Sequence, residues 1–387
     1  MIKPSILVAP GPYKECLSSD EVAAAIKLGI LDILPNSNVF VLPLSDGGSG
    51  ITNVLTEATG GHIEKMKVHG PLGDEVDAFF GVLGDKQTVV IESASAAGLV
   101  LVPQERRNPL LTSTFGVGEL IKAAVSYGAK NIIVGCGDSA TNDCGIGCAS
   151  ALGVKFFDKN GNAIVGFLAG KDLKSIYSID VSEVLKNYSD IKIIVACNLS
   201  SILCGQDGTS RIYGPQKGAT PQQIETLEQG VEQFVEVVYK EFNSELAFIP
   251  GCGGAGGLAA SLYAFFGAKL TYSIDVVDRY LNFDQYLKKV DLVLTGEGRI
   301  DDRTATGKVA CGIALKAKRY NLPVVAIVGS IGENHDDIYS NGIDAVECIV
   351  DGPMTIQDSF ANAQKLIRHA TTRVMRYEFL KGKKSDG

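Results

Sequence analysis

Acidic, basic and glycine residues interleave in the stretch Thr295-Gly296-Glu297-Gly298-Arg299-Ile300-Asp301-Asp302-Arg303-Thr304-Ala305-Thr306-Gly307-Lys308. The stretch directly follows an apolar run, residues 290–294, which is interrupted only by Asp291 and predicts a buried strand. Polar, glycine-rich segments that leave the ends of buried strands are where α/β proteins bind anions and metals. The stretch therefore predicts an α/β fold and a candidate site at the same place.

Strands and helices alternate on both sides of this stretch. After it, strands are predicted at 323–328 and 345–349, with helices near 308–320 and 357–377. In the N-terminal segment, a strand is predicted at 5–9, then a helix, then a strand at 39–44. A capping box of Ser18 and Glu21 marks the start of the helix. Short connections of this kind indicate βαβ units and hence a parallel sheet.

The middle of the chain has a different pattern. Strands are predicted at 64–68, 75–83 and 88–93, and hairpin-like turns separate them, which indicates an antiparallel or mixed sheet. We therefore predict a two-domain α/β protein. Residues 1–65 and 288–387 form one discontinuous domain with a doubly wound parallel sheet, and residues 66–287 form a second α/β domain with a mixed sheet.

Composition excludes several classes of protein. The chain has 387 residues, 45% of them hydrophobic and 21% charged, which is typical of a globular protein with more than one domain. A net charge of −8 argues against a nucleic-acid footprint. No apolar run approaches the roughly 20 residues of a membrane span, and no leader precedes the first strand, so we expect a cytoplasmic protein without a membrane partner.

A second polar segment, Gly135-Cys-Gly-Asp-Ser-Ala-Thr-Asn-Asp-Cys-Gly-Ile-Gly147, follows another predicted strand. Its Ser139, Thr141, Asn142 and Asp143 are short polar side chains at the start of a predicted helix. Thr141 and Asn142 are candidate hydrogen-bond donors to a ligand, and Asp143 is a candidate metal ligand or base. The alternative is a network that satisfies the N-terminus of the helix.

Two glycine motifs bear on nucleotide binding. Gly307-Lys308 is followed by Val309 and lacks the upstream glycine, so it is not a Walker A loop. Residues 251–256 match Gly-x-Gly-x-x-Gly, but they lie deep in the chain after Pro250. Their glycines Gly253 and Gly254 either cradle an oxyanion or allow close helix packing.

Together with Asp46-Gly-Gly-Ser-Gly50, Gly214-Pro-Gln-Lys-Gly-Ala-Thr220 and Gly251-Cys-Gly-Gly-Ala-Gly-Gly257, these segments resemble the glycerate kinases of the bacterial type (class I). The resemblance runs over nearly the whole chain. It implies a flavodoxin-like domain interrupted by another α/β domain. It also implies ATP- and Mg²⁺-dependent phosphorylation of a hydroxyl of glycerate, or a closely related small hydroxy acid, in the cleft between the two domains.

Candidate residues follow from the motifs and the resemblance. Such a reaction needs donors for the phosphates, carboxylates for Mg²⁺ and a clamp for the substrate carboxylate. The candidates are Lys14, Asp46, Asp143 and Arg299 for catalysis; Ser139, Thr141, Asn142, Lys217, Gly253, Gly254, Glu297 and Lys308 for substrate or phosphate; and Asp46, Asp143 and Asp301 for the metal.

The chain departs from the family pattern in several motifs. Gly137-Asp138 stands where the family has Gly-Gly, and four positions lose an acid. Gly11, Ser49, Asn198 and Ser200 are uncharged where the family carries acids. The alternatives are therefore a kinase for a different polyol or hydroxy acid, a catalytically inactive homologue that binds a metabolite, and an NAD(P)-dependent oxidoreductase built on residues 251–256. The partner expected is a small molecule, and a homodimer is left open.

Overall fold

The computed structural model describes residues 3–301, 304 and 309–382, with side chains up to residue 377. It divides into two compact units. Unit 1 comprises residues 1–46 and 277–387, and unit 2 comprises residues 47–276. Helix α10 (Ser273–Leu281) spans the second boundary.

Unit 1 is built on a five-stranded parallel sheet of order β14-β13-β12-β1-β2. From the β2 edge, and numbered within the unit, this order is 2-1-3-4-5, that of flavodoxin-like proteins. The prediction of a doubly wound parallel sheet is confirmed. The strands are β1 (Ser5–Val8), β2 (Asn38–Val41), β12 (Leu292–Ile300), β13 (Val324–Ile331) and β14 (Ala345–Cys348).

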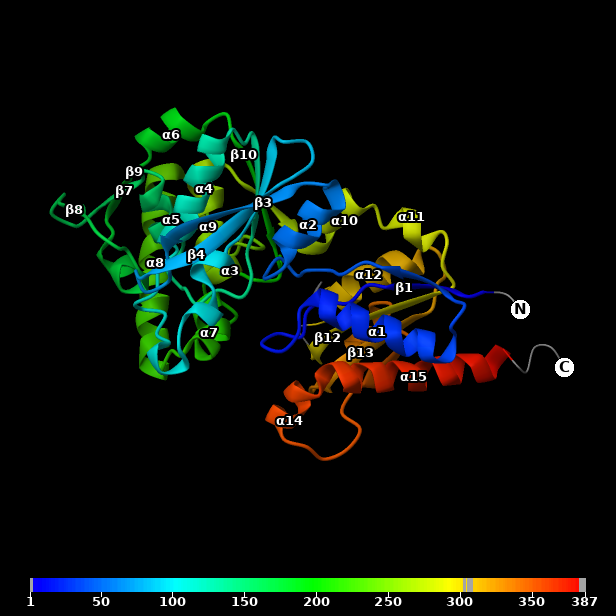
Figure 1. Cartoon of the computed structure of the whole chain (residues 1–387). Helices are drawn as coiled ribbons and strands as arrows, with labels where there is room; N and C mark the ends of the chain where they lie inside the picture. Colours follow the sequence, from blue (N-terminus) through cyan, green and yellow to red (C-terminus); the bar gives the residue numbers. More distant parts are fainter. Residues whose placement is uncertain (1–2, 302–303, 305–308, 383–387) are drawn as a thin grey trace. The chain divides into compact units, whose positions relative to one another are not determined.

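Helices cover both faces of this sheet (Figure 1). Helix α1 (Ser19–Ile33) and helix α15 (Ala363–Gly382) pack side by side on one face, and α12 (Val309–Lys318) lies on the other. The predicted capping box is present, because the Glu21 amide donates to Ser18 Oγ and the Ser18 amide donates to the Glu21 carboxylate. The short helices are α11 (Asp284–Leu287), α13 (Asp337–Ser340) and α14 (Ile356–Ala361).

Unit 2 contains a six-stranded mixed sheet of order β11-β10-β6-β5-β4-β3. The first four strands in this order are parallel, and β4 pairs antiparallel with both β5 and β3, as the hairpin turns predict. The strands are β3 (His62–His69), β4 (Glu75–Val82), β5 (Thr88–Glu92), β6 (Asn131–Gly135), β10 (Lys192–Cys197) and β11 (Lys269–Tyr272).

Helix α2 (Ile51–Thr59) packs on β4 and β5 of this sheet and therefore belongs to unit 2. The boundaries expected from the sequence, at 65 and 288, put this helix in the other domain. The structure places the crossings at 46/47 and 276/277, because residues 47–61 contact the mixed sheet.

Unit 2 also contains a second, three-stranded sheet of order β8-β7-β9 and several helices. The sequence patterns do not predict that small sheet. The strands are β7 (Lys155–Phe157), β8 (Ala163–Ile164) and β9 (Ser178–Asp180); the helices are α3 (Ala94–Ala97), α4 (Phe115–Tyr127), α5 (Ile146–Ala151), α6 (Ser182–Tyr188), α7 (Thr209–Tyr213), α8 (Pro221–Phe242) and α9 (Gly254–Phe266), with 3₁₀ turns η1 (Leu99–Leu101), η2 (Gln104–Arg106), η3 (Gly170–Ser175) and η4 (Pro215–Lys217).

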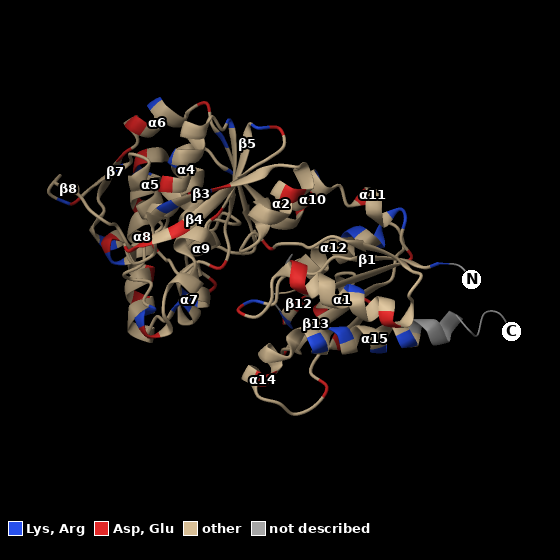
Figure 2. Ribbon diagram, in the orientation of Figure 1, with Lys and Arg blue, Asp and Glu red and all other residues tan. Residues whose placement is uncertain are grey.

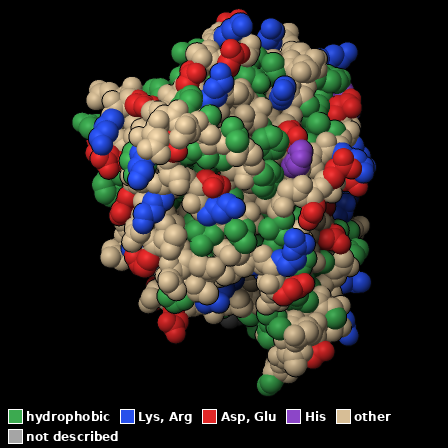
Figure 3. Space-filling view, turned by 90° about the vertical axis from the view of Figure 1, so that its left-hand side faces the viewer, with side chains coloured by type: hydrophobic (Ala, Val, Ile, Leu, Met, Phe, Trp, Pro, Cys, Tyr) green, Lys and Arg blue, Asp and Glu red, His purple; other side chains and the backbone are tan. Residues whose placement is uncertain are grey.

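Charged residues of both signs are distributed over the helices of each unit (Figure 2). On the face of the molecule shown in Figure 3, acidic, basic and hydrophobic side chains are interspersed. Among the helices that the structure describes, none combines the length and the apolar character needed to cross a membrane.

Candidate functional site

The carboxyl ends of β1 and β12 are neighbours in unit 1, and the strand order reverses between them. In open α/β sheets, ligands bind at such a switch point. The two segments that leave these strands are joined by backbone hydrogen bonds, from the Ala9 amide to the Leu294 carbonyl and from the Gly11 amide to the Gly296 carbonyl, both 2.8 Å. The polar stretch that begins at Thr295 therefore starts at the place where this topology favours a ligand.

Lys14 lies in the loop after β1, and its Nζ is 2.8 Å from Asp46 Oδ2. The loop is anchored by Tyr13, whose buried hydroxyl donates to the Ile327 carbonyl at 2.9 Å. The Lys14 side chain is 54% exposed and that of Asp46 is 23% exposed. An exposed ion pair contributes at most about 1 kcal/mol to stability. The pair thus places an accessible cation beside a carboxylate without being needed to hold the fold.

Glu297 and Arg299 belong to strand β12, which continues through Ile300 and pairs with β13 from Val293 to Ile300. The sequence predicted that this strand ends at residue 294, before both residues, and that prediction is wrong. Glycines and charges interrupt the apolar run, but the backbone pairing with β13 continues through them. Glu297 and Arg299 are therefore held by a sheet, which positions side chains more rigidly than a loop does.

The acidic side chains at the end of β12 are only partly accessible. The Thr304 hydroxyl donates to Glu297 Oε1, and the Asp301 amide donates to Thr304 Oγ1 at 3.2 Å. Arg299 Nε is 3.7 Å from Asp301 Oδ2; the arginine side chain is 64% exposed, whereas that of Asp301 is 8% exposed. The exposed end of the guanidinium can thus reach an anion. The buried Asp301 carboxylate lies beside Nε and orients the arginine side chain. Lys308 lies outside the described residues.

In unit 2, the parallel strands β5, β6, β10 and β11 end at one edge of the mixed sheet. The segment Ser139–Asp143 follows β6 at this edge. All four of its polar residues are buried. The structure brings together Ser139, Thr141, Asn142, Asp143 and Lys217.

Asp143 is completely buried and accepts hydrogen bonds with both carboxylate oxygens. Oδ2 accepts from the Thr114 amide at 2.9 Å, the Thr114 hydroxyl at 2.8 Å and the Gly147 amide at 3.3 Å, while Oδ1 accepts from the Gly145 amide at 3.0 Å. Burial raises the pKa of this carboxyl, and these hydrogen bonds oppose that shift. This arrangement is the helix-start network that the sequence left open as an alternative to a metal ligand or base.

Lys217 is 3% exposed and holds the Ser139–Asp143 segment. Its Nζ donates to Ser139 Oγ at 3.0 Å and to the Thr141 carbonyl at 2.6 Å. Burial lowers the pKa of this amine to about 7, and the nearby Asp143 carboxylate opposes the shift. A buried amine with these two partners braces the segment from within.

Asn142 has one satisfied and one orphaned polar atom, and its side chain is fully buried. Its Nδ2 donates to Ser210 Oγ at 3.1 Å, while Oδ1 has no hydrogen-bond partner among the described residues. An unpaired buried oxygen costs about 1–3 kcal/mol unless another group satisfies it. Asn142 is thus a residue whose side chain has capacity for one more donor.

The amides of Gly253 and Gly254 both donate to backbone carbonyls of the protein. The Gly253 amide donates to the Ser201 carbonyl at 3.1 Å and the Gly254 amide to the Gly251 carbonyl at 2.9 Å. A Cβ atom at Gly253 would lie 2.2 Å from the Ile202 carbonyl oxygen. Gly253 therefore permits a close approach of two backbone segments, whereas a Cβ atom at Gly254 would lie 3.2 Å from Cys197 Cβ.

Sequence reasoning missed two carboxylates at the same edge, Glu92 and Asp138. Glu92 is 5% exposed, and its Oε2 accepts from the Gly50 amide at 2.9 Å and the Thr52 amide at 3.4 Å. Burial raises the pKa of Glu92 to about 7. Asp138 Oδ2 accepts from the Ser49 amide at 3.0 Å. The sequence held a signal for both. Glu92 is the last residue of an apolar strand, and Asp138 follows another apolar strand by three residues.

The four positions that lose an acid relative to the family pattern fall in both units. Asn198 Oδ1 accepts from the amide and the hydroxyl of Ser200, both at 3.0 Å, in a local turn after β10. The Ser49 amide donates a hydrogen bond to Asp138 Oδ2. A Cβ atom at Gly11 would stand 3.5 Å from its nearest neighbours, which is ordinary contact distance, so a side chain fits there.

The surroundings of each carboxylate determine whether it could bind Mg²⁺. Within the described ranges, no group of three or more His, Cys, Asp and Glu residues could hold a metal. Mg²⁺ in kinases needs only one or two carboxylates, because waters and substrate phosphates complete its shell. The partly exposed Asp46 fits that requirement, and Asp301 fits it less well because it is more buried. Both oxygens of Asp143 are already used by backbone and hydroxyl donors.

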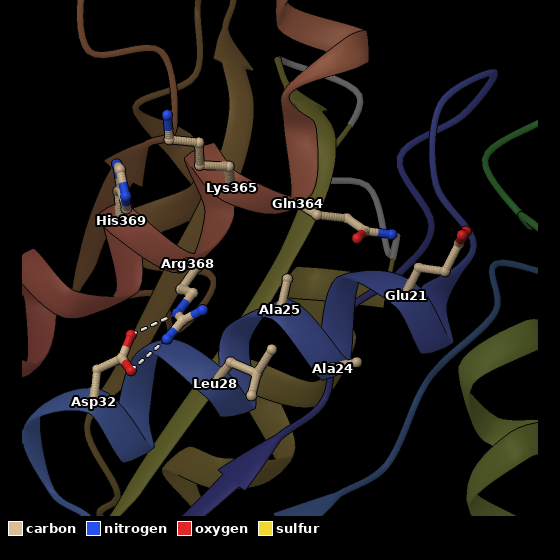
Figure 4. Close-up of a pocket in the computed structure, with 9 residues that line it drawn as sticks. All are labelled: Glu21, Ala24, Ala25, Leu28, Asp32, Gln364, Lys365, Arg368 and His369. Carbon is tan, nitrogen blue, oxygen red and sulfur yellow. Dashed lines mark hydrogen bonds and ion pairs between the residues drawn. The ribbon is translucent and has the colours of Figure 1, made fainter.

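A groove of about 600 Å³ lies elsewhere on unit 1, between α1 and α15 (Figure 4). Leu28 lines it, and Asp32 and Arg368 form a two-pronged ion pair with both distances 2.6 Å. None of the candidate residues lines this groove.

The whole chain is similar to known proteins. The model of the "Glycerate kinase family" matches residues 6–378. Relatives named glycerate kinase in Bacillus subtilis (strain 168) and glycerate 2-kinase in Escherichia coli (strain K12) are 43% and 42% identical over 92% and 95% of this chain, and over 93% and 96% of their own lengths. A crystal structure of a glycerate kinase 2 from Salmonella typhimurium LT2 has a TM-score of 0.79 and 41% identity, covering 99% of this chain and 100% of that one.

Proposed function

The chain belongs to the glycerate kinase family, and we propose that it transfers a phosphoryl group from ATP to a hydroxyl of glycerate. It is a phosphotransferase with an alcohol acceptor. The observation that carries the proposal is similarity over nearly the full length: the relatives at 41–43% identity match more than nine-tenths of the chain and are named glycerate kinase or glycerate 2-kinase. An ATP-dependent enzyme works where ATP is present, so we place it in the cytoplasm.

Family membership favours this function over the alternatives. An NAD(P)-dependent oxidoreductase would need the 251–256 loop as its phosphate cradle, yet the Gly253 and Gly254 amides already donate to the Ser201 and Gly251 carbonyls. A kinase for another small acid, or an inactive homologue, rests on the uncharged positions Gly11, Ser49, Asn198 and Ser200. The relatives whose names state an activity support the glycerate kinase reading instead.

The residues of unit 1 supply charge to the reaction. Arg299, exposed on rigid strand β12, can present a two-pronged guanidinium to phosphate or carboxylate oxygens. Lys14 offers a point charge for the carboxylate of glycerate or for a phosphate. Asp46, with Asp301, would hold Mg²⁺, which neutralises developing charge on the phosphates when bound.

The residues of unit 2 supply hydrogen bonds and rigidity. Asn142, with its unpaired buried oxygen, can accept from a hydroxyl or ammonium group of a neighbouring molecule or side chain. Asp143 and Lys217 brace the segment that carries it. Positioning and charge stabilisation account for most of the catalysis of phosphoryl transfer, so no covalent nucleophile is needed.

The test is coupled ADP release with MgATP against D-glycerate, L-glycerate, tartronate, erythronate and short polyols. Release without an acceptor and in the presence of EDTA serves as the background. We expect turnover with glycerate, and NMR of the product then identifies the phosphorylated hydroxyl. Turnover only with another acceptor would assign a different substrate, and thermal stabilisation by ligands without turnover would favour an inactive homologue.

A further inference from the structure

Asp138 has a backbone conformation that side-chain-bearing residues rarely adopt. Its φ is +53°, in the left-handed region. A non-glycine residue costs about 1 kcal/mol or more in this conformation, whereas glycine adopts it freely. The loop that leaves β6 therefore carries an aspartate where glycine would fit the backbone better, which indicates that the carboxylate itself is used.

The Asp138 carboxylate joins two loops. Its Oδ2 accepts from the amide of Ser49 at 3.0 Å. The backbones also touch here, because a Cβ atom at Gly137 would lie 2.5 Å from Gly48 Cα. The Gly47–Gly50 loop directly follows Asp46, a carboxylate of the candidate site. Asp138 thus fastens the glycine loop that continues from that carboxylate.

The same residue leads into the Ser139–Asp143 segment. The Asp138 carbonyl accepts from the Leu99 amide at 2.8 Å, and Ser139 forms an isolated β-bridge with Gly98. Lys217 holds Ser139 from the other side. Asp138 is therefore the link between the Gly47–Gly50 loop and the braced polar segment.

We propose that Asp138 is a positioning residue for phosphoryl transfer, and that its carboxylate fixes the Gly47–Gly50 loop against the Ser139–Asp143 segment. The proposal rests on the proposed kinase function. Asp138 acts through the Ser49 amide and the adjoining backbone. Misplacement of a substrate-positioning loop by about 1 Å can lower turnover by up to about 10²-fold.

Two variants and one control separate this role from a general effect on stability. Asp138→Gly removes the carboxylate and relaxes the backbone, while Asp138→Asn keeps an acceptor oxygen for the Ser49 amide but removes the charge. Lys86→Gly is the matched control, because Lys86 also has a left-handed φ, +58°, and lies exposed in the turn between β4 and β5.

For Asp138→Gly we expect a melting temperature equal to or above that of the wild type, with kcat reduced about tenfold or more and KM for glycerate changed less than about threefold. Asp138→Asn should show a smaller loss of kcat, and Lys86→Gly should have wild-type kinetics. In hydrogen exchange, the amides of residues 47–52 should exchange faster in Asp138→Gly than in the wild type.

A wild-type kcat in Asp138→Gly would overturn the proposal, as would unchanged exchange at residues 47–52. If Asp138→Gly does not fold, the same two measurements on Asp138→Asn decide. If the wild-type protein itself does not turn over glycerate, the proposed function fails. The exchange measurement then still decides whether Asp138 holds the loop, because it requires no substrate.

Discussion

The buried amine of Lys217 predicts an unusual dependence of stability on pH. Its pKa in the folded protein is lowered to about 7 from an ordinary value of 10.5. Between these two values, the unfolded chain binds one more proton at this site than the folded protein does. Stability from this group is therefore complete above pH 10.5 and is lost as the pH falls toward 7.

The size of the effect follows from the two pKa values. Raising the pH from about 7.5 to about 9 should stabilise the folded protein by about 2 kcal/mol through Lys217 alone. Lys217→Met removes the titrating group and this contribution. The variant also loses the hydrogen bonds to Ser139 and Thr141, which lowers its stability by an amount that does not depend on pH over this range.

The assay is urea unfolding at both pH values, followed by circular dichroism and tyrosine fluorescence to reveal whether one transition or two occur. Burial raises the pKa of thiols such as Cys136, so the folded protein loses stability at alkaline pH when these thiols ionise in the unfolded chain. That effect is common to all variants and cancels in the comparison. Lys174→Met, at an exposed lysine, should follow the wild type. If wild type and Lys217→Met change in parallel with pH, the reasoning about the buried amine is refuted; Lys217→Gln replaces Lys217→Met if that variant does not fold.

Asp143→Asn should lower the free energy of unfolding by about 2–4 kcal/mol, because an amide NH₂ would face donors that now point at a carboxylate. The melting temperature should fall accordingly in thermal unfolding, and an unchanged melting temperature would contradict this. Arg299→Ala should lower kcat/KM for MgATP by about 10²-fold with the melting temperature unchanged, since the side chain is 64% exposed; wild-type kinetics would remove it from the site. Gly256→Ala should prevent stable folding, because its Cβ would lie 1.9 Å from the Thr141 carbonyl oxygen, whereas Gly267→Ala, also left-handed but in open space, should cost only about 1 kcal/mol; equal melting temperatures would show that the contact is not tight.

The strands and helices that carry strong apolar patterns could be predicted from the sequence. The βα alternation at both ends of the chain led to the doubly wound sheet, and the turns at 70–73 and 84–85 led to the antiparallel part of the mixed sheet. The three-stranded sheet could not be predicted, because its strands have only two or three residues and no periodicity. The end of β12 was misjudged because local composition was polar while pairing with β13, a non-local contact, decided the conformation.

The candidate site was predicted in part. The motifs gave Lys14, Asp46, Arg299 and the Ser139–Asp143 segment, and the structure brings Lys14 to Asp46 and Lys217 to the segment. The sequence could not separate a carboxylate that faces a ligand from one that satisfies the backbone. That distinction depends on hydrogen-bond partners far apart in the chain, such as Asp143 with Thr114.

The insertion of unit 2 within unit 1 affects how the chain can reach its folded state. The central strand pairing of unit 1 joins residues 286 positions apart, as in the bond from the Ser5 amide to the Asp291 carboxylate, so it cannot form until most of the polypeptide has been synthesised. Unit 2 is continuous in sequence and can fold earlier. Its two ends meet, because a Cβ atom at Gly47 would lie 2.3 Å from Ser273 Oγ. Once unit 2 is folded, the loop that β1 and β12 must close shrinks from 286 residues to roughly 60, which lowers the entropic cost of closure by about 1 kcal/mol.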